Sequence, residues 1–252
     1  MFYTLLKKEF LELRRTSKLI IYLAVFFISG LISPVLAKYT PALLNSIPNL
    51  PAGFAGMIPE PTVQDAVSQY IKNVSQFGIL LVILLTMGVL AQEKERGTAA
   101  MLLTKPVKRS AVVLSKWVAG MGSVLAGLIL GGLGCIVYTA VLFEVLPLGP
   151  FALLNLLLLV YFSVFLSVAL LASTLVRTQS MAAVGAFGGL AILLILGAIP
   201  RVSDYLPGQL LAWGAALVFK GGLTAWPALA VSIGLIVLCL ASACFYFERE
   251  EI

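Results

Sequence analysis

The side chains of this sequence that offer the most chemistry gather in one stretch, from Glu93 to Lys116. Long apolar segments flank the stretch on both sides. A charged side chain at the centre of a bilayer costs roughly 2.5 to 3.5 kcal/mol on insertion scales. We therefore expect an aqueous loop, and its basic bias places it in the cytoplasm. Six of the seventeen Lys and Arg residues lie here: Lys94, Arg96, Lys105, Lys108, Arg109 and Lys116.

A short uncharged run inside this loop predicts a helix of one to two turns. The run extends from Thr98 to Leu103 and is followed by Pro106. Threonine is a good N-cap residue, and proline disfavours helical geometry in the residue before it. The predicted helix lies just outside the membrane, with charges on both flanks, and it presents three apolar side chains: Met101, Leu102 and Leu103.

Catalytic chemistry is poorly represented in the sequence. Histidine is absent, which removes the commonest metal ligand and the usual proton shuttle. Hydroxyl residues occur within the apolar segments, but a serine there most often donates a hydrogen bond to its own helix. The sequence has no GxxxxGK[ST] phosphate-binding loop. We therefore expect no catalytic site, no metal site and no cofactor bound by this chain.

The composition indicates a membrane protein. Hydrophobic residues make up 61% of the 252 residues and charged residues only 11%, with a mean hydropathy of +1.06; about 25% of a soluble domain is charged. Each spanning helix needs roughly 20 residues, so the length allows about six. We expect an all-α polytopic membrane protein formed by one transmembrane domain over residues 1–252. The net charge of +6 reports membrane orientation rather than binding of nucleic acid.

The hydropathy pattern predicts the order of the elements. An amphipathic helix at 1–18 is expected to lie in the membrane interface. A proline-containing loop with short helices at 38–72 is expected on the outer side, as are re-entrant or interfacial helices at 200–222. The six predicted spans cover residues 19–37, 74–92, 116–143, 151–176, 181–199 and 223–247.

The basic residues predict the orientation. Thirteen of the seventeen fall on the side that carries both termini, which places the termini in the cytoplasm and the chain in the inner (plasma) membrane. Lys116 and Trp117 are expected to form an interfacial pair, with the lysine reaching toward the headgroups. Small residues four positions apart, Ser123, Gly127 and Gly131, predict close approach of another helix, within the chain or in a dimer.

Several motifs together resemble one known family. Glu93-x-Glu95-x-Gly97-Thr98, followed by Leu102-Leu103, Pro106-Val107, Arg109 and Lys116, resembles the first cytoplasmic loop of the type-2 ABC transporter permease family. A Leu-Pro-x-x-Leu-Leu stretch at 206–211, a Trp-Pro opening to the last span and a Phe-x-Arg-Glu tail at 247–250 agree with it. The resemblance covers essentially the whole chain, and the loop is its most specific part.

The resemblance implies a six-helix half-transporter of an exporter. It would pair with a second copy or paralogue and with separately encoded ATP-binding subunits, which hold the ATP and Mg²⁺. The first inner loop would supply a coupling helix at 97–104 that docks on the ATPase, with a smaller contact at 177–181. The implied docking residues are Glu93, Glu95, Gly97, Thr98, Met101, Leu102, Leu103, Pro106, Arg109 and Arg177.

Other readings of the same sequence stay open at this point. Some relatives of the family assist the maturation of a metal centre or transmit a signal, and six methionines leave a soft-metal route available. A secondary transporter or channel is disfavoured, since the predicted spans carry no charged residue near their middles. The apolar run at 101–103 also fits a helix tucked into the headgroups without a partner.

Overall fold

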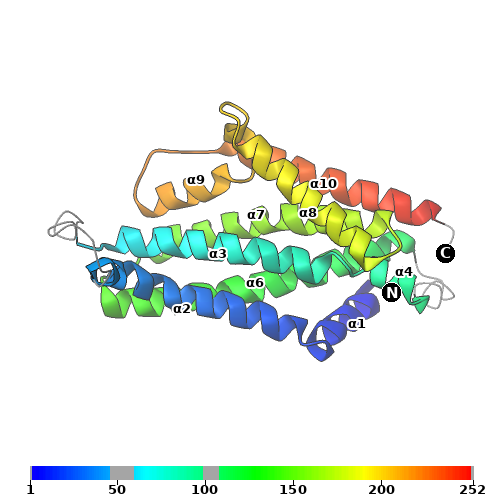
Figure 1. The fold of residues 1–252 in the computed structure, drawn as a ribbon, viewed down its shortest axis with the longest axis horizontal. Coiled ribbons are helices and arrows are strands. Elements are labelled where there is room, and N and C mark those ends of the chain that lie inside the picture. Colours follow the sequence, from blue (N-terminus) through cyan, green and yellow to red (C-terminus); the bar gives the residue numbers. More distant parts are fainter. Residues whose placement is uncertain (1, 46–59, 99–107, 251–252) are drawn as a thin grey trace.

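The computed structural model of this chain describes residues 2–45, 60–98 and 108–250. Within these ranges the fold is helical without strands, and six helices are long and apolar enough to cross a membrane. Figure 1 shows an elongated bundle in which α1 begins and α10 ends at the same end, where α4 also lies. We call this the termini end and the opposite one the far end. The helices, in chain order, are α1 (Phe2–Arg15), α2 (Lys18–Asn45), α3 (Val63–Thr86), α4 (Ala91–Glu95), α6 (Arg109–Leu142), α7 (Leu148–Leu175), α8 (Gln179–Gly197), the 3-10 helix η2 (Ser203–Tyr205), α9 (Gln209–Val218) and α10 (Trp226–Arg249).

The backbones of α2 and α6 touch directly. A Cβ atom added to Gly30 would lie 2.0 Å from the carbonyl oxygen of Gly131, and one added to Gly127 would lie 2.6 Å from the ring of Phe26. Ser123, the third member of the small-residue stripe, is also buried. The stripe on α6 is therefore packed within the chain, the first of the two uses that its spacing allowed.

Aromatic rings join this helix pair to the centre of the bundle. The rings of Phe26 and Phe162 meet edge to face with centroids 5.5 Å apart, and both side chains are buried. Gly78 of α3 lies against Phe162, where a Cβ atom would be 2.5 Å from the ring. Helices α2, α3, α6 and α7 thus share one core, of which α7 forms the most buried part.

Two helices extend into the segment that the sequence predicted as a loop at 38–72. Helix α2 continues to Asn45 and α3 already begins at Val63, so the prediction was wrong at both ends of that segment. The polar residues that ended the apolar pattern are used inside the protein: the Asn73 amide donates to the Ser33 hydroxyl at 3.0 Å. Helix α3 also has a capping box between Thr62 and Asp65.

A short helix follows the fifth long one, as the sequence predicted. Helix α9 has 10 residues, about 15 Å at 1.5 Å per residue, which is too short to cross a bilayer. It packs against α7, and the rings of Trp213 and Trp226, 5.0 Å apart, connect it to the start of α10 (Figure 1). Its re-entrant position in a membrane, like the interfacial position of α1, stays a prediction.

Candidate functional site

A buried ion-pair cluster joins three helices at the termini end. The Lys116 ammonium group of α6 lies 3.2 Å from the Glu9 carboxylate of α1 and 2.8 Å from Oε1 of Glu93 in α4. The Lys116 side chain is only 1% exposed and that of Glu9 only 6%. Burying a charge is costly unless it is paired, so these groups hold α1, α4 and α6 to one another.

A second lysine completes the cluster from the solvent side. Lys8 Nζ lies 3.0 Å from Glu9 Oε1, 3.0 Å from Glu93 Oε1 and 3.2 Å from Glu12 Oε2. Partial burial would lower the pKa of Lys8, but the adjacent carboxylates of Glu9 and Glu93 outweigh it and raise the pKa well above its ordinary value. Three carboxylates converge here, and because two ammonium groups lie among them, the cluster is built as an ion-pair network rather than as a cation site.

The sequence-based view of Lys116 and Trp117 was wrong. Lys116 does not reach toward the headgroups, because Glu9 and Glu93 pair with it inside the protein. The Trp117 indole N–H donates to the Ser167 hydroxyl of α7 at 2.8 Å, so this ring also faces the bundle. Both side chains follow the partners available on neighbouring helices, which hydropathy does not reveal.

Lys94, which follows Glu93 in α4, binds a different part of the bundle. Its ammonium group forms an ion pair with Glu250 after the end of α10 and donates to the carbonyl oxygen of Thr174 in α7. It also lies over the Phe247 ring, 5.7 Å from the centroid. The Lys94 side chain is 4% exposed, so α4 is fastened to α7 and α10 through a buried cation.

Glu95 and the start of α4 contact the start of α8 and the end of α7. The Glu95 carboxylate accepts a hydrogen bond from the backbone N–H of Gln179, at the start of α8. The buried Ser173 hydroxyl accepts from the backbone N–H groups of Leu90 at 3.0 Å and Ala91 at 2.9 Å. Three consecutive side chains, 93 to 95, therefore bind three different parts of the bundle.

Two arginines, one at the start of α6 and one between α7 and α8, contact the last turn of α10 and Glu250 after it. Arg109, at the start of α6, donates to the carbonyl oxygens of Phe247, Glu248 and Glu250. Arg177, between α7 and α8, lies 3.9 Å from the Glu250 carboxylate and is largely exposed. Glu250 thus gathers contacts from both sides of the loop and from the α7–α8 turn.

The described residues of the predicted docking set fall into two groups. Glu95, Gly97, Thr98 and Arg177 are exposed, whereas Glu93 and Arg109 are partly buried by contacts within the chain. Met101, Leu102, Leu103 and Pro106 lie outside the described residues. Docking by any of these residues stays a prediction.

Sequence reasoning missed Glu9 and Ser173. Glu9 carries a weak signal: it follows Leu5 by four positions, and these two are the buried residues of α1. An acidic residue on the inward face of a helix requires a buried cation, and Lys116 meets that requirement. Ser173 carries no such signal. The other serines behave as expected, since Ser163 and Ser167 donate to backbone carbonyls three and four residues earlier in α7.

Comparisons with known proteins agree with this architecture. The chain is 29% identical over 256 residues to a protein of Bacillus subtilis (strain 168) named uncharacterized transmembrane protein YxlG, which covers 98% of this chain and 97% of that protein. A family model described as ABC-2 family transporter protein matches residues 3–252. With six apolar helices and a match over nearly its whole length, this chain belongs to the ABC-2 transporter family, whose members are membrane permease components of ABC transporters.

Proposed function

We propose that this chain is the permease subunit of an ATP-driven exporter and receives mechanical work from a separate ATP-binding subunit through the loop at 93–116. The ATP and Mg²⁺ are held by that partner, and a second copy or paralogue of the chain completes the transporter. The observation that carries the proposal is that three consecutive side chains bind different helices. Glu93 binds α1 and α6, Lys94 binds α7 and the end of α10, and Glu95 binds α8. A push on this loop acts on every one of these helices.

The contacts around α4 suit the transmission of force. Glu93 and Lys94 pair with groups that are mostly hidden from water, where ion pairs are screened less and resist separation more than surface pairs do. Arg109 ties the other end of the loop to the backbone after α10. Both ends of the loop are therefore anchored to the bundle, so a displacement of the loop moves helices instead of only bending the loop.

The proposed docking element is the apolar run at 101–103, presented between charged flanks. An apolar helix face set in a groove is a common mode of protein recognition. We place the termini end in the cytoplasm, where an ATP-binding subunit reaches it. Of the thirteen basic residues that the sequence assigns to the cytoplasm, the twelve that the structure describes lie in segments at that end, and the positive-inside rule then supports this orientation (Figure 1).

Export is the direction that we propose from the family resemblance. It is tested with inside-out vesicles that contain the permease and its ATP-binding subunit. ATP added outside these vesicles should drive cargo into the lumen, and cargo leaving the lumen would contradict export.

Docking is tested by the double substitution Leu102→Asp with Leu103→Asp. The substitution removes the apolar contact of the two leucines and would bury two carboxylates in an apolar groove, which is costly. We therefore expect the ATP-binding subunit to be lost in a pull-down and its ATP hydrolysis to fall to the level of the free subunit. The matched control is Val145→Asp with Leu148→Asp, two exposed residues at the far end. It adds the same charge and should leave both readouts unchanged. Retention of the partner and of stimulated hydrolysis by the 102/103 variant would overturn the proposed docking.

A further inference from the structure

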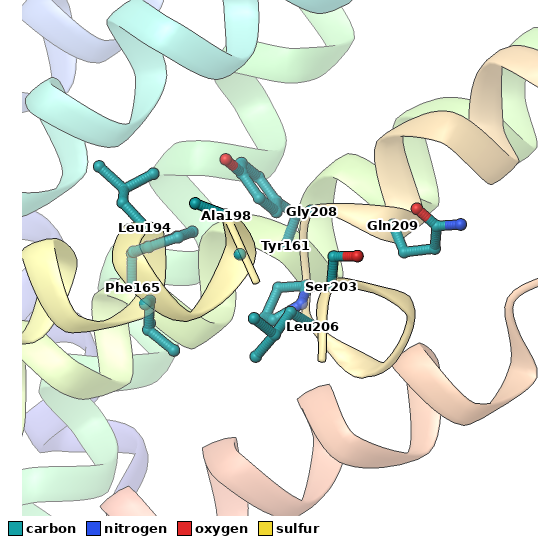
Figure 2. Close-up of a pocket in the computed structure, with 11 residues that line it drawn as sticks. Tyr161, Phe165, Leu194, Ala198, Ser203, Leu206, Gly208 and Gln209 are labelled. Carbon is teal, nitrogen blue, oxygen red and sulfur yellow. The ribbon is translucent and has the colours of Figure 1, made fainter. Parts of the chain in front are cut away.

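A cavity of about 440 Å³ lies where α7, the end of α8, the η2 segment and the start of α9 meet. Figure 2 shows the lining side chains, with Phe165 and Leu194 on one side of the view and Ser203 and Gln209 on the other. The volume is within the range typical of small-molecule sites. The cavity therefore has an apolar end and a polar end.

Three polar side chains of the lining are without hydrogen-bond partners. The Tyr161 hydroxyl, the Ser203 hydroxyl and the Gln209 amide make no hydrogen bond within the part of the chain that the structure describes. Tyr161 as a residue is only 6% exposed, and it lines the cavity. In contrast, Tyr70 on α3 donates to Asn155 at 2.7 Å. The lining thus keeps donors and acceptors available to a ligand.

The depth of the cavity limits the charge of that ligand. Tyr161 is the fourteenth of the 28 residues of α7, so it lies about 20 Å from either end of this helix. The hydrocarbon core of a bilayer is about 30 Å thick, which places the cavity inside it when α7 crosses the membrane. The lining contains no charged side chain. An ionised ligand there would be desolvated without a counter-ion.

We infer that this cavity binds an uncharged single-chain amphiphile of the monoacylglycerol class. Its hydroxyl head pairs with Tyr161, Ser203 and Gln209, and its chain lies against Phe165 and Leu194. The inference is independent of the direction of transport and of the ATP-binding subunit, because it concerns binding to this chain alone.

The test uses the purified full chain in phosphatidylcholine nanodiscs and a monoacylglycerol with a diazirine in its acyl chain. After irradiation, labelled peptides are identified by mass spectrometry. We expect labels on peptides from α7, α8 and α9, and we expect excess unlabelled monoacylglycerol to reduce them at least fivefold. A long-chain trimethylammonium salt should compete much less.

A matched glycine pair tests the location. Gly197→Leu extends a side chain from the end of α8 into the cavity, and its first atom is tolerated because the nearest neighbour, Leu206, is 3.9 Å away. Gly188→Leu lies on the same helix with nothing within 4 Å and away from the cavity. We expect at least a tenfold loss of labelling for the first variant and none for the second.

Tyr161→Phe keeps the ring and removes only the hydroxyl, so it tests the polar end even if Gly197→Leu does not fold. We expect it to weaken competition by monoacylglycerol about fivefold, as for one neutral hydrogen bond. The inference is overturned if labelling of α7, α8 and α9 does not saturate, if folded Gly197→Leu labels like the wild type, if Tyr161→Phe leaves competition unchanged, or if the cationic amphiphile competes equally well.

Discussion

The ammonium group of Lys116 lies 3.2 Å from both carboxylate oxygens of Glu9, although the two residues are 107 positions apart in the chain. This pair joins the N-terminal helix α1 to α6 at the level where the 93–116 loop leaves the bundle. Glu93 shares the same ammonium group. The position of α1 is therefore coupled to that of the loop through one buried cation.

Removal of that cation should destabilise the fold. In Lys116→Met, Glu9 and Glu93 keep only Lys8 as a partner, and breaking a buried pair in this way costs about 3–5 kcal/mol. The free energy of unfolding, measured by denaturant titration in detergent micelles, should fall accordingly. Lys7→Met is the control. Lys7 is exposed on α1, so this substitution should change the free energy of unfolding by less than about 0.5 kcal/mol. Equal stability of the two variants would show that the cluster contributes nothing.

Loss of the Ser173 hydroxyl should loosen α4. Ser173→Ala leaves the buried backbone N–H groups of Leu90 and Ala91 without an acceptor, at a cost of about 1–3 kcal/mol. Hydrogen exchange of these two amides should accelerate. The matched control is Ser163→Ala on the same helix, whose hydroxyl donates only to a carbonyl of its own helix, so the Leu90 and Ala91 amides should exchange as in the wild type. Unchanged protection in Ser173→Ala would contradict the described contact.

A methyl group between α2 and α6 should separate these helices. Gly30→Ala places a Cβ atom 2.0 Å from the Gly131 carbonyl oxygen, and such overpacking costs about 1–3 kcal/mol. Gly234→Ala in α10 meets nothing within 4 Å, and alanine is the better helix former, so it should be neutral or slightly stabilising. Thermal unfolding of the two variants should therefore shift in opposite directions or by clearly different amounts. A Gly30→Ala variant as stable as Gly234→Ala would show that the two backbones do not touch.

Lys94→Met should uncouple ATP hydrolysis from transport if the proposed function holds. The variant loses the ion pair to Glu250 and the hydrogen bond to Thr174, which connect α4 to α10 and α7. We expect the ATP-binding subunit to remain bound while cargo moved per ATP falls at least about fivefold, the lower end of typical coupling energies. Lys72→Met, exposed on α3, is the control and should transport normally. Normal transport per ATP in Lys94→Met would exclude this connection from the path of force.

The long apolar segments were predictable because hydropathy is a local property. Within a bilayer, a helix lets about twenty consecutive apolar residues cross with all their backbone N–H and C=O groups hydrogen-bonded inside the segment. Each of the six long helices overlaps a predicted span, and the short α9 lies in the predicted segment 200–222. The helix ends were less predictable: α2 continues to Asn45 and α3 already begins at Val63, and Asn73, just before the predicted span, pairs with Ser33 across the two helices.

The charged loop was also visible in the sequence, but its anchoring was not. The density of charges between 93 and 116 predicted a loop in water, although Lys94 and Lys116 are in fact buried against ion-pair partners. The motif in that loop indicated the family, which the match over residues 3–252 confirms. The sequence did not show whether Lys116 points to the membrane interface or into the protein, since an interfacial and a buried lysine look alike in one sequence. Only the packing of α1 against α6 brings Glu9 to it.

The sequence alone therefore determined the helical membrane class and the number of long apolar segments, because both depend on the local free energy of transfer from water to lipid. The tertiary structure decided which charges pair, which glycines touch and where a cavity remains. These depend on contacts between residues far apart in the chain, such as Glu9 with Lys116 and Gly30 with Gly131, and no local pattern encodes them.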